Sequence, residues 1–203
     1  MTSGLYSDGR WTEGHGPRLT NKCPASGEIV WDGNAADANQ VEGAVASARK
    51  AFDSWSRLPQ SDRTAILERY AEENGTMKAK VAVSIAAQNE RAGSKFEQSA
   101  FGSSHLTHRA HGVMAVFGPF NFPGHLPNGH IVPALLAGNT CVFKPSELAP
   151  GVAALMAEAF QAAGLPDGCL NIVHGARDTG GALLNAEING LLFTGSANTG
   201  VFF

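Results

Sequence analysis

The stretch GPFNFPGHLPNGH, residues 118–130, carries the side chains of this sequence that are best suited to chemistry. Asn121 stands between Pro119 and Pro123, and proline fixes the backbone angle φ and removes a hydrogen-bond donor. The amide of Asn121 is therefore expected on a constrained turn, where it could stabilise an oxyanion formed at a carbonyl group. An ordinary turn-forming asparagine is the alternative.

A lysine and a glutamate, Lys144 and Glu147, follow a second apolar run in the sequence TCVFKPSE. Lys144 could supply a cation. Glu147 could accept hydrogen bonds from the hydroxyl groups of a ribose, and its charge would disfavour a 2′-phosphate. A solvated ion pair at the start of a helix explains the same two residues.

Glycines follow two further apolar runs. Gly175, in VHGARDTG, could allow close approach of an adenine or a ribose, although a turn glycine explains it equally well. The other segment consists of Gly195, Ser196, Ala197, Asn198, Thr199 and Gly200. Its backbone amides could face a pyrophosphate at a helix N-terminus. It has neither the GK[ST] ending of a P-loop nor the spacing G-x-G-x-x-G, and an ordinary strand-to-helix turn is the alternative.

The elements that position these residues alternate between strand and helix from residue 111 onward. Continuous apolar runs predict strands, and patterns of helical period separate them. The strands are expected at 112–119, 140–146, 169–175 and 188–195, and the helices at 129–139, 148–164 and 176–185. Residues 124–130 are expected to form the turn into the first of these helices. This alternation predicts an α/β fold, a Rossmann-like parallel sheet with helices on both faces. Ligands bind beyond the carboxyl ends of such strands, where all the candidate residues lie.

The first 110 residues are expected to be mainly helical after a polar, turn-rich start. Apolar residues at helical spacing predict helices at 34–55, 61–74 and 77–93. Asn34 is the expected N-cap of the first helix, with Asp37 in its first turn, and Ser61 is the expected cap of the second. We therefore divide the chain into a helical segment, 1–110, and an α/β segment, 111–203.

Composition excludes several other classes. The 203 residues carry a formal net charge of −3, which favours neither a nucleic-acid partner nor a membrane surface. No apolar run is long enough to cross a bilayer, and the N-terminus does not resemble a secretory signal. Cys23, Cys141 and Cys169 lack pair spacing, which argues against a metal site or disulfides and for the reducing cytoplasm.

Four ordered motifs give the chain a resemblance to a known family, the NAD(P)-dependent aldehyde dehydrogenases. The motifs are FNFP, the run PALLAGNTCVFKPSE, AGLPDGCLNIV and LLFTGS, and the earlier VEGAVASARKAFDSW is also similar to that family. FNFPGHLPNGHI and GSANTG resemble the branch that oxidises N-succinyl-L-glutamate 5-semialdehyde to N-succinyl-L-glutamate with NAD⁺ in arginine catabolism. A branch acting on succinate or glutamate semialdehyde is an alternative.

The resemblance implies a role for most of the candidate residues. Asn121 would hold the oxyanion of the covalent intermediate, while Pro119 and Phe120 would line the cofactor channel. Lys144 and Glu147 would bind the adenosine ribose of NAD, and residues 195–200 would lie along its pyrophosphate. The implied partner is a small aldehyde, and full-length relatives are expected to form homo-oligomers.

The chain also departs from the family pattern. The family's nucleophilic cysteine and general-base glutamate follow the cofactor loop by many residues, whereas this sequence ends at Phe203. None of its three cysteines stands where the nucleophile should. A helical stretch of the family, between residues 100 and 101, is mostly missing. We therefore expect an amino-terminal portion with an internal deletion, in which residues 1–110 are the partly deleted helical segment of the cofactor domain and residues 111–203 are an incomplete NAD-binding, Rossmann-like domain. We expect the catalytic domain to be absent from this portion, which would have no dehydrogenase activity of its own. A non-catalytic nucleotide-binding fragment is the competing interpretation.

Overall fold

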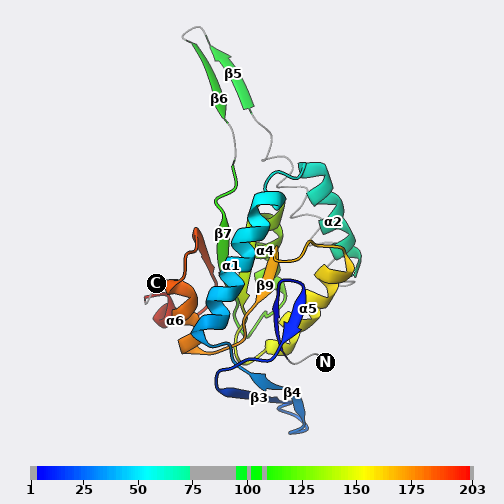
Figure 1. Cartoon of the computed structure of the whole chain (residues 1–203), viewed down its shortest axis with the longest axis vertical. Coiled ribbons are helices and arrows are strands. Elements are labelled where there is room, and N and C mark those ends of the chain that lie inside the picture. Colours follow the sequence, from blue (N-terminus) through cyan, green and yellow to red (C-terminus); the bar gives the residue numbers. More distant parts are fainter. Residues whose placement is uncertain (1–3, 74–94, 100–101, 107–108, 202–203) are drawn as a thin grey trace.

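The computed structural model describes residues 4–73, 95–99, 102–106 and 109–201 (Figure 1). The strands are β1 (Leu5–Ser7), β2 (Arg10–Thr12), β3 (Arg18–Lys22), β4 (Ile29–Asn34), β5 (Lys95–Ser99), β6 (Gly102–Leu106), β7 (Val113–Phe117), β8 (Thr140–Lys144), β9 (Leu170–Ile172) and β10 (Gly190–Phe193). The helices are α1 (Ala38–Trp55), α2 (Gln60–Glu73), α4 (His125–Leu136), α5 (Pro150–Ala162), α6 (Arg177–Asn185) and α7 (Ala197–Gly200).

The central sheet has the strand order β10-β7-β8-β9-β1-β2. Strands β10, β7, β8 and β9 run parallel to one another, which confirms the α/β fold expected from residue 111 onward. The sheet is mixed, because β1 lies antiparallel to β9 and β2 lies antiparallel to β1. The amino-terminal segment thus contributes strands to the sheet as well as covering helices.

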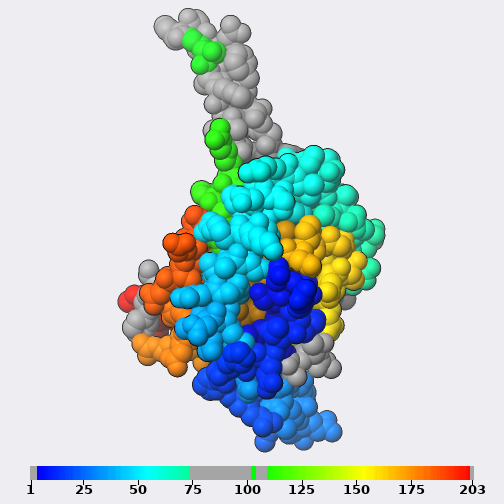
Figure 2. Space-filling model, viewed as in Figure 1, coloured from blue at the N-terminus to red at the C-terminus, as the bar shows by residue number. Residues whose placement is uncertain are grey.

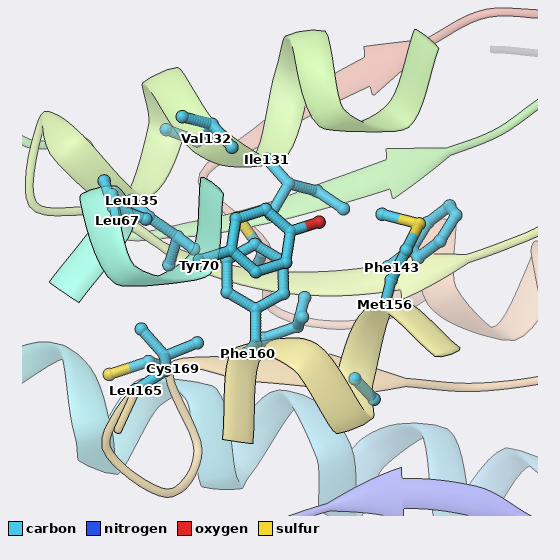
Figure 3. Close-up of a cluster of buried hydrophobic side chains, with 14 of the residues drawn as sticks. Leu67, Tyr70, Ile131, Val132, Leu135, Phe143, Met156, Phe160, Leu165 and Cys169 are labelled. Carbon is cyan, nitrogen blue, oxygen red and sulfur yellow. The ribbon is translucent and has the colours of Figure 1, made fainter. Parts of the chain in front are cut away.

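Two apolar cores cover the two faces of the sheet. On β7, Val113, Ala115 and Phe117 contribute to the core beneath α1 and α6, whereas Val116 contributes to the other core, beneath α2, α4 and α5. All five residues of β8 are buried, as a parallel strand covered on both faces requires. This second core includes Tyr70 of α2, whose ring stacks on that of Phe160 in α5 with 3.5 Å between centroids (Figure 3).

Helix α1 begins later than the sequence predicts. Asp37 is its N-cap, and its carboxylate accepts a hydrogen bond from the backbone N–H of Gln40 at 2.8 Å. The Gln40 side chain in turn accepts from the N–H of Asp37, completing a capping box. The prediction of Asn34 as the cap was wrong, because Asn34 is the last residue of β4. In Figure 2, α1 crosses the visible face between α6 and the amino-terminal strands.

The sequence predicts two further helices in this segment, at 61–74 and 77–93. Helix α2 begins at Gln60, so Ser61 lies inside its first turn and the prediction of Ser61 as the cap was wrong. The helix predicted at 77–93 lies outside the described residues.

Two hairpins extend from the body. Strands β3 and β4 form one at the end where the carboxyl edge of the sheet lies, and β5 and β6 form another that projects from the opposite end (Figure 1). No helix in the described part of the chain is both long and apolar enough to cross a membrane.

Candidate functional site

The carboxyl ends of the parallel strands meet at one edge, and backbone hydrogen bonds continue just past them. The N–H of Thr194, after β10, donates to the carbonyl of Phe117 at 3.2 Å. The N–H of Gly118, after β7, donates to the carbonyl of Lys144 at 3.1 Å. The loops that follow β10, β7 and β8 are therefore brought together, as the sequence predicts.

Lys144, the last residue of β8, is buried at this edge. Its ammonium group donates to the carbonyls of Gly175 at 2.6 Å and Pro145 at 2.9 Å, and lies 3.7 Å from a carboxylate oxygen of Glu147. Burial lowers the pKa of Lys144, and the charge of Glu147 opposes that shift. Glu147 is exposed, and its carbonyl accepts from the side chain of Asn21 on β3 at 2.9 Å. The two residues form an ion pair, but the prediction of a solvated pair was wrong for the lysine, which is buried while the carboxylate faces solvent.

Gly175, in the turn between β9 and α6, leaves no room for a side chain. A Cβ atom there would lie 1.9 Å from Oγ1 of Thr179, which donates to the carbonyl of Ala36 at 2.9 Å. The Gly175 carbonyl is also the acceptor for Lys144. The glycine is thus required by its close contact with the side chain of Thr179.

His174, next to Gly175, is a residue of this edge that the sequence analysis did not select. It is 1% exposed, and neither ring nitrogen makes a hydrogen bond of ordinary geometry with the described residues. Its ring lies 5.0 Å from that of Trp31, on β4. Burial, followed by the nearby charge of Lys144, lowers the pKa of His174 to about 4, with a smaller opposing effect from the Gly4 backbone. The imidazole of His174 is therefore uncharged near neutral pH, and it lies close enough to Lys144 for the ammonium charge to affect its pKa.

The loop 195–200 follows β10 and is exposed throughout. Ser196 is the N-cap of the short helix α7, and its hydroxyl accepts from the N–H of Thr199 at 3.2 Å. The first-turn amides of Ala197 and Asn198 have no intrahelical acceptor, as at any helix start. A Cβ atom on Gly195 would lie 2.5 Å from the Phe193 ring, so the chain turns tightly around that ring.

Asn121 lies in the exposed loop that joins β7 to α4. Pro119 is half-buried, and Phe120 is 62% exposed. At the start of the loop, a Cβ atom on Gly118 would lie 2.7 Å from Cγ of Pro127. The loop therefore begins at a point fixed by close contact with α4, while Asn121 itself faces outward.

Helix α4 begins at His125, so the prediction that residues 124–130 form only a turn was wrong. Pro127 occupies the third helical position, where its missing N–H would have no intrahelical acceptor. It is therefore compatible with the helix start. Pro133 lies inside the helix.

The three cysteines differ from one another in burial and in the pKa of their thiols. Cys141 and Cys169 are buried, and burial raises the pKa of both thiols, that of Cys169 to about 12. Cys23 lies at the turn of the β3–β4 hairpin, and the side chain and backbone of Ser26 lower its pKa. The buried pair has the character of packing residues. Within the described residues, no three His, Cys, Asp or Glu side chains cluster as metal ligands would.

The fold and this edge define a doubly wound α/β protein, in which ligands bind beyond the carboxyl ends of the strands. A model of the aldehyde dehydrogenase family matches residues 11–100 and 76–201. The chain therefore belongs to the aldehyde dehydrogenase family, as the four sequence motifs indicate.

Relatives and solved structures support this assignment. An N-succinylglutamate 5-semialdehyde dehydrogenase of Burkholderia mallei (strain SAVP1) is 52% identical over 223 residues, covering 97% of this chain and 46% of that protein. The enzyme of the same name from Paraburkholderia xenovorans is 49% identical, covering 98% and 46%. The crystal structure of a Mycobacterium tuberculosis aldehyde dehydrogenase complexed with NAD⁺ matches with a TM-score of 0.85 and 31% identity, covering 98% of this chain and 48% of that one. The chain spans about half the length of the curated relatives it matches.

Proposed function

We propose that this chain is the NAD-binding part of a dehydrogenase that oxidises N-succinyl-L-glutamate 5-semialdehyde to N-succinyl-L-glutamate. The observation that carries the proposal is the 52% identity, along nearly the whole chain, to a relative named for this reaction. The family also favours a small aldehyde as the partner. We extend to the whole protein the expectations of a cytoplasmic location and a homo-oligomeric state.

The residues at the carboxyl edge fit the cofactor. The donor set suits an adenosine ribose, because Lys144 presents a cation and Glu147 an exposed carboxylate 3.7 Å away. Gly175 and Gly195 leave the backbone without a side chain at two strand ends, where a ligand could approach it closely. A Cβ atom at either position would overlap a neighbouring side chain. The loop 195–200 offers the first-turn amides of α7 to a pyrophosphate. When bound, NAD⁺ would accept the hydride that leaves the substrate.

The loop after β7 would serve the substrate. Asn121 faces outward on a turn whose start is fixed by packing against Pro127, so its amide N–H could be held toward a developing oxyanion. Pro119 and Phe120 lie in the same loop, directly before Asn121. We propose that they line the channel in which the nicotinamide would lie.

We further propose that these 203 residues do not turn over substrate alone. Cys141 and Cys169 are buried with raised thiol pKa values, whereas a catalytic cysteine needs an accessible thiolate. Cys23 is half-buried with a lowered pKa, but it stands in the turn between β3 and β4, whereas the family's nucleophile follows the cofactor loop in the sequence. An internal deletion is also supported, because 97% of the 203 residues is about 197, fewer than the 223 residues over which the Burkholderia mallei relative matches. The buried cysteines favour a second candidate, a non-catalytic nucleotide-binding module.

Two measurements test these proposals. Isothermal titration of the purified chain with NAD⁺ should give saturable binding, and no binding would contradict the assigned cofactor site. Incubation with NAD⁺ and N-succinyl-L-glutamate 5-semialdehyde should produce no steady NADH signal, and continuous NADH production would contradict the proposed inactivity.

The substrate is tested in a chimera that joins residues 1–201 to the remaining sequence of the Burkholderia mallei relative. Selective oxidation of the succinylated semialdehyde, with little activity on succinate semialdehyde, is the expected result. A folded chimera that binds NAD⁺ but oxidises neither aldehyde would favour the non-catalytic module.

A further inference from the structure

One side-chain hydrogen bond joins the two loops that the proposed function uses separately. Nε2 of His130, on α4, lies 2.8 Å from Oγ1 of Thr194, although the residues are 64 positions apart. Thr194 is the residue between β10 and Gly195, where the cofactor loop begins. His130 lies on the helix that follows the Asn121 loop. Neither His130 nor Thr194 has a role in the function proposed above.

Thr194 is held from two directions. Its N–H donates to the carbonyl of Phe117, the last residue before the Asn121 loop, and its hydroxyl contacts His130 just after that loop. The two contacts therefore connect Thr194 to both ends of the segment that carries Asn121. A shift of Thr194 would move the start of the 195–200 loop relative to that segment.

The cofactor loop has few other attachments. Its side-chain hydrogen bonds in the described part of the chain join Ser196 and Thr199 to each other, within the loop itself. Gly195 and Gly200 lie against the Phe193 ring, so this contact also helps to position the loop. The remainder of the loop is exposed. The His130–Thr194 hydrogen bond is thus well placed to fix the direction in which the loop 195–200 leaves β10.

We propose that His130 is a positioning residue, which acts through Thr194 to fix the cofactor loop relative to the loop that carries Asn121. The inference rests on the proposed function, since it assigns a purpose to the spacing between an oxyanion donor and a bound cofactor. His130 itself contacts neither ligand in this scheme. Its imidazole ring is half-buried, and burial lowers its pKa, so it makes the bond in its uncharged form at neutral pH.

The test uses the 203-residue chain and a set of matched variants. His130→Phe removes both ring nitrogens at similar size, Thr194→Val removes only the hydroxyl, and a double variant removes both partners. His130→Gln restores a polar group that can reach the hydroxyl. Thr12→Val, an exposed threonine on β2, is the control for the loss of a hydroxyl from a strand.

The first readout requires no cofactor. Amide hydrogen exchange at position 194 and across residues 195–200 should accelerate roughly two- to tenfold in His130→Phe and in Thr194→Val. The double variant should be no worse than either single variant, because both substitutions break the same bond. His130→Gln should recover part of the protection, and Thr12→Val should match the wild type. Unchanged exchange in the loop, or additive effects in the double variant, would overturn the inference.

The second readout separates this inference from the proposed function. If the wild type binds NAD⁺, both single variants should weaken binding by a similar factor of roughly two to ten, while the melting temperature falls by no more than a few degrees. Unaltered NAD⁺ affinity in these variants would overturn the positioning role and leave the cofactor site intact. If the wild type does not bind NAD⁺, the proposed cofactor is wrong, and the exchange data alone decide whether His130 holds the loop.

Discussion

The ammonium nitrogen of Lys144 lies 2.6 Å from the carbonyl oxygen of Gly175, so the last residue of β8 holds the turn that follows β9. The same lysine faces the exposed carboxylate of Glu147 at 3.7 Å. The ammonium group of Lys144 therefore links the carboxyl ends of β8 and β9. It also supplies positive charge at the edge where a nucleotide would bind. Such a group should affect both ligand affinity and stability when it is replaced.

Lys144→Met should weaken NAD⁺ binding by roughly tenfold to a hundredfold, because hydrogen bonds from a charged group are stronger than neutral ones. Titration calorimetry on the folded variant is the measurement. Lys50→Met, which removes an exposed lysine of α1, is the matched control and should bind like the wild type. Equal affinities for the two variants would remove Lys144 from the site.

Glu147→Gln should reduce the preference for NAD⁺ over NADP⁺. The carboxylate would repel a 2′-phosphate, and the amide keeps the shape of the side chain without the charge. The dissociation constant of NADP⁺ divided by that of NAD⁺ should fall several-fold, mainly because NADP⁺ binds more tightly. A ratio that stays constant would mean that Glu147 does not face the ribose.

Gly175→Ala should destabilise the fold by about 1–3 kcal/mol, as is typical when an added methyl group overpacks a site. The new Cβ atom would lie 1.9 Å from Oγ1 and 2.4 Å from Cβ of Thr179. Gly181→Ala is the control, because a Cβ atom there meets nothing within 4 Å, and helical alanine is favoured. Urea unfolding of both variants measures the difference. An unaltered midpoint for Gly175→Ala would contradict the tight packing.

His174 should make stability depend on pH between about 6.5 and 4. In the unfolded chain a histidine binds its proton near pH 6.5, whereas in the fold the pKa is about 4. The unfolded state therefore binds more protons in this window, so the stability conferred by His174 is complete above about pH 6.5 and is lost as the pH falls toward 4.

His174→Phe should remove this dependence. At pH 4.5 the variant should retain about 2–3 kcal/mol that the wild type loses, relative to pH 7. His111→Phe, an exposed histidine, should keep the wild-type slope. Urea unfolding at both pH values gives the free energies, and parallel losses in wild type and His174→Phe would show that His174 does not titrate as described.

Thiol labelling should distinguish the three cysteines. Cys23 is half-buried with a lowered pKa and should react with a disulfide reagent in the native chain. Cys141 and Cys169 are buried with raised pKa values and should react only in denaturant. Cys23→Ser should abolish the native reaction. Rapid labelling of a second thiol would reveal an accessible cysteine and reopen the question of a nucleophile.

The strands after residue 111 could be predicted because each is a continuous apolar run, which is what burial on both faces requires. The gathering of Lys144, Gly175 and Gly195 at one edge then followed from the rule that ligands bind beyond parallel strand ends. Strands β1 to β4 were not predicted, since they are three to six residues long and largely polar in sequence.

Other features depend on contacts that no local pattern contains. The start of α4 at His125 depends on Pro127 packing against Gly118, and tertiary contact of this kind overrides the turn tendency of the sequence. The position of His174 behind Lys144 depends on burial by the β3–β4 hairpin, through Trp31. A histidine at a strand end was visible in the sequence, but nothing there indicated which residues would cover it.

The pairing of β1 with β9 constrains the order in which the chain can fold. Tyr6 is in register with Ile172, and the hydroxyl of Ser7 donates to the side chain of Asn171 at 3.1 Å. During synthesis, the first strand must wait until more than four-fifths of these 203 residues have emerged before it finds its partner. Contacts of such long sequence separation slow folding and leave unpaired strands exposed in the meantime. Strand β1 therefore joins the sheet only after β9 has been made, although Ser7 precedes Asn171 by 164 residues.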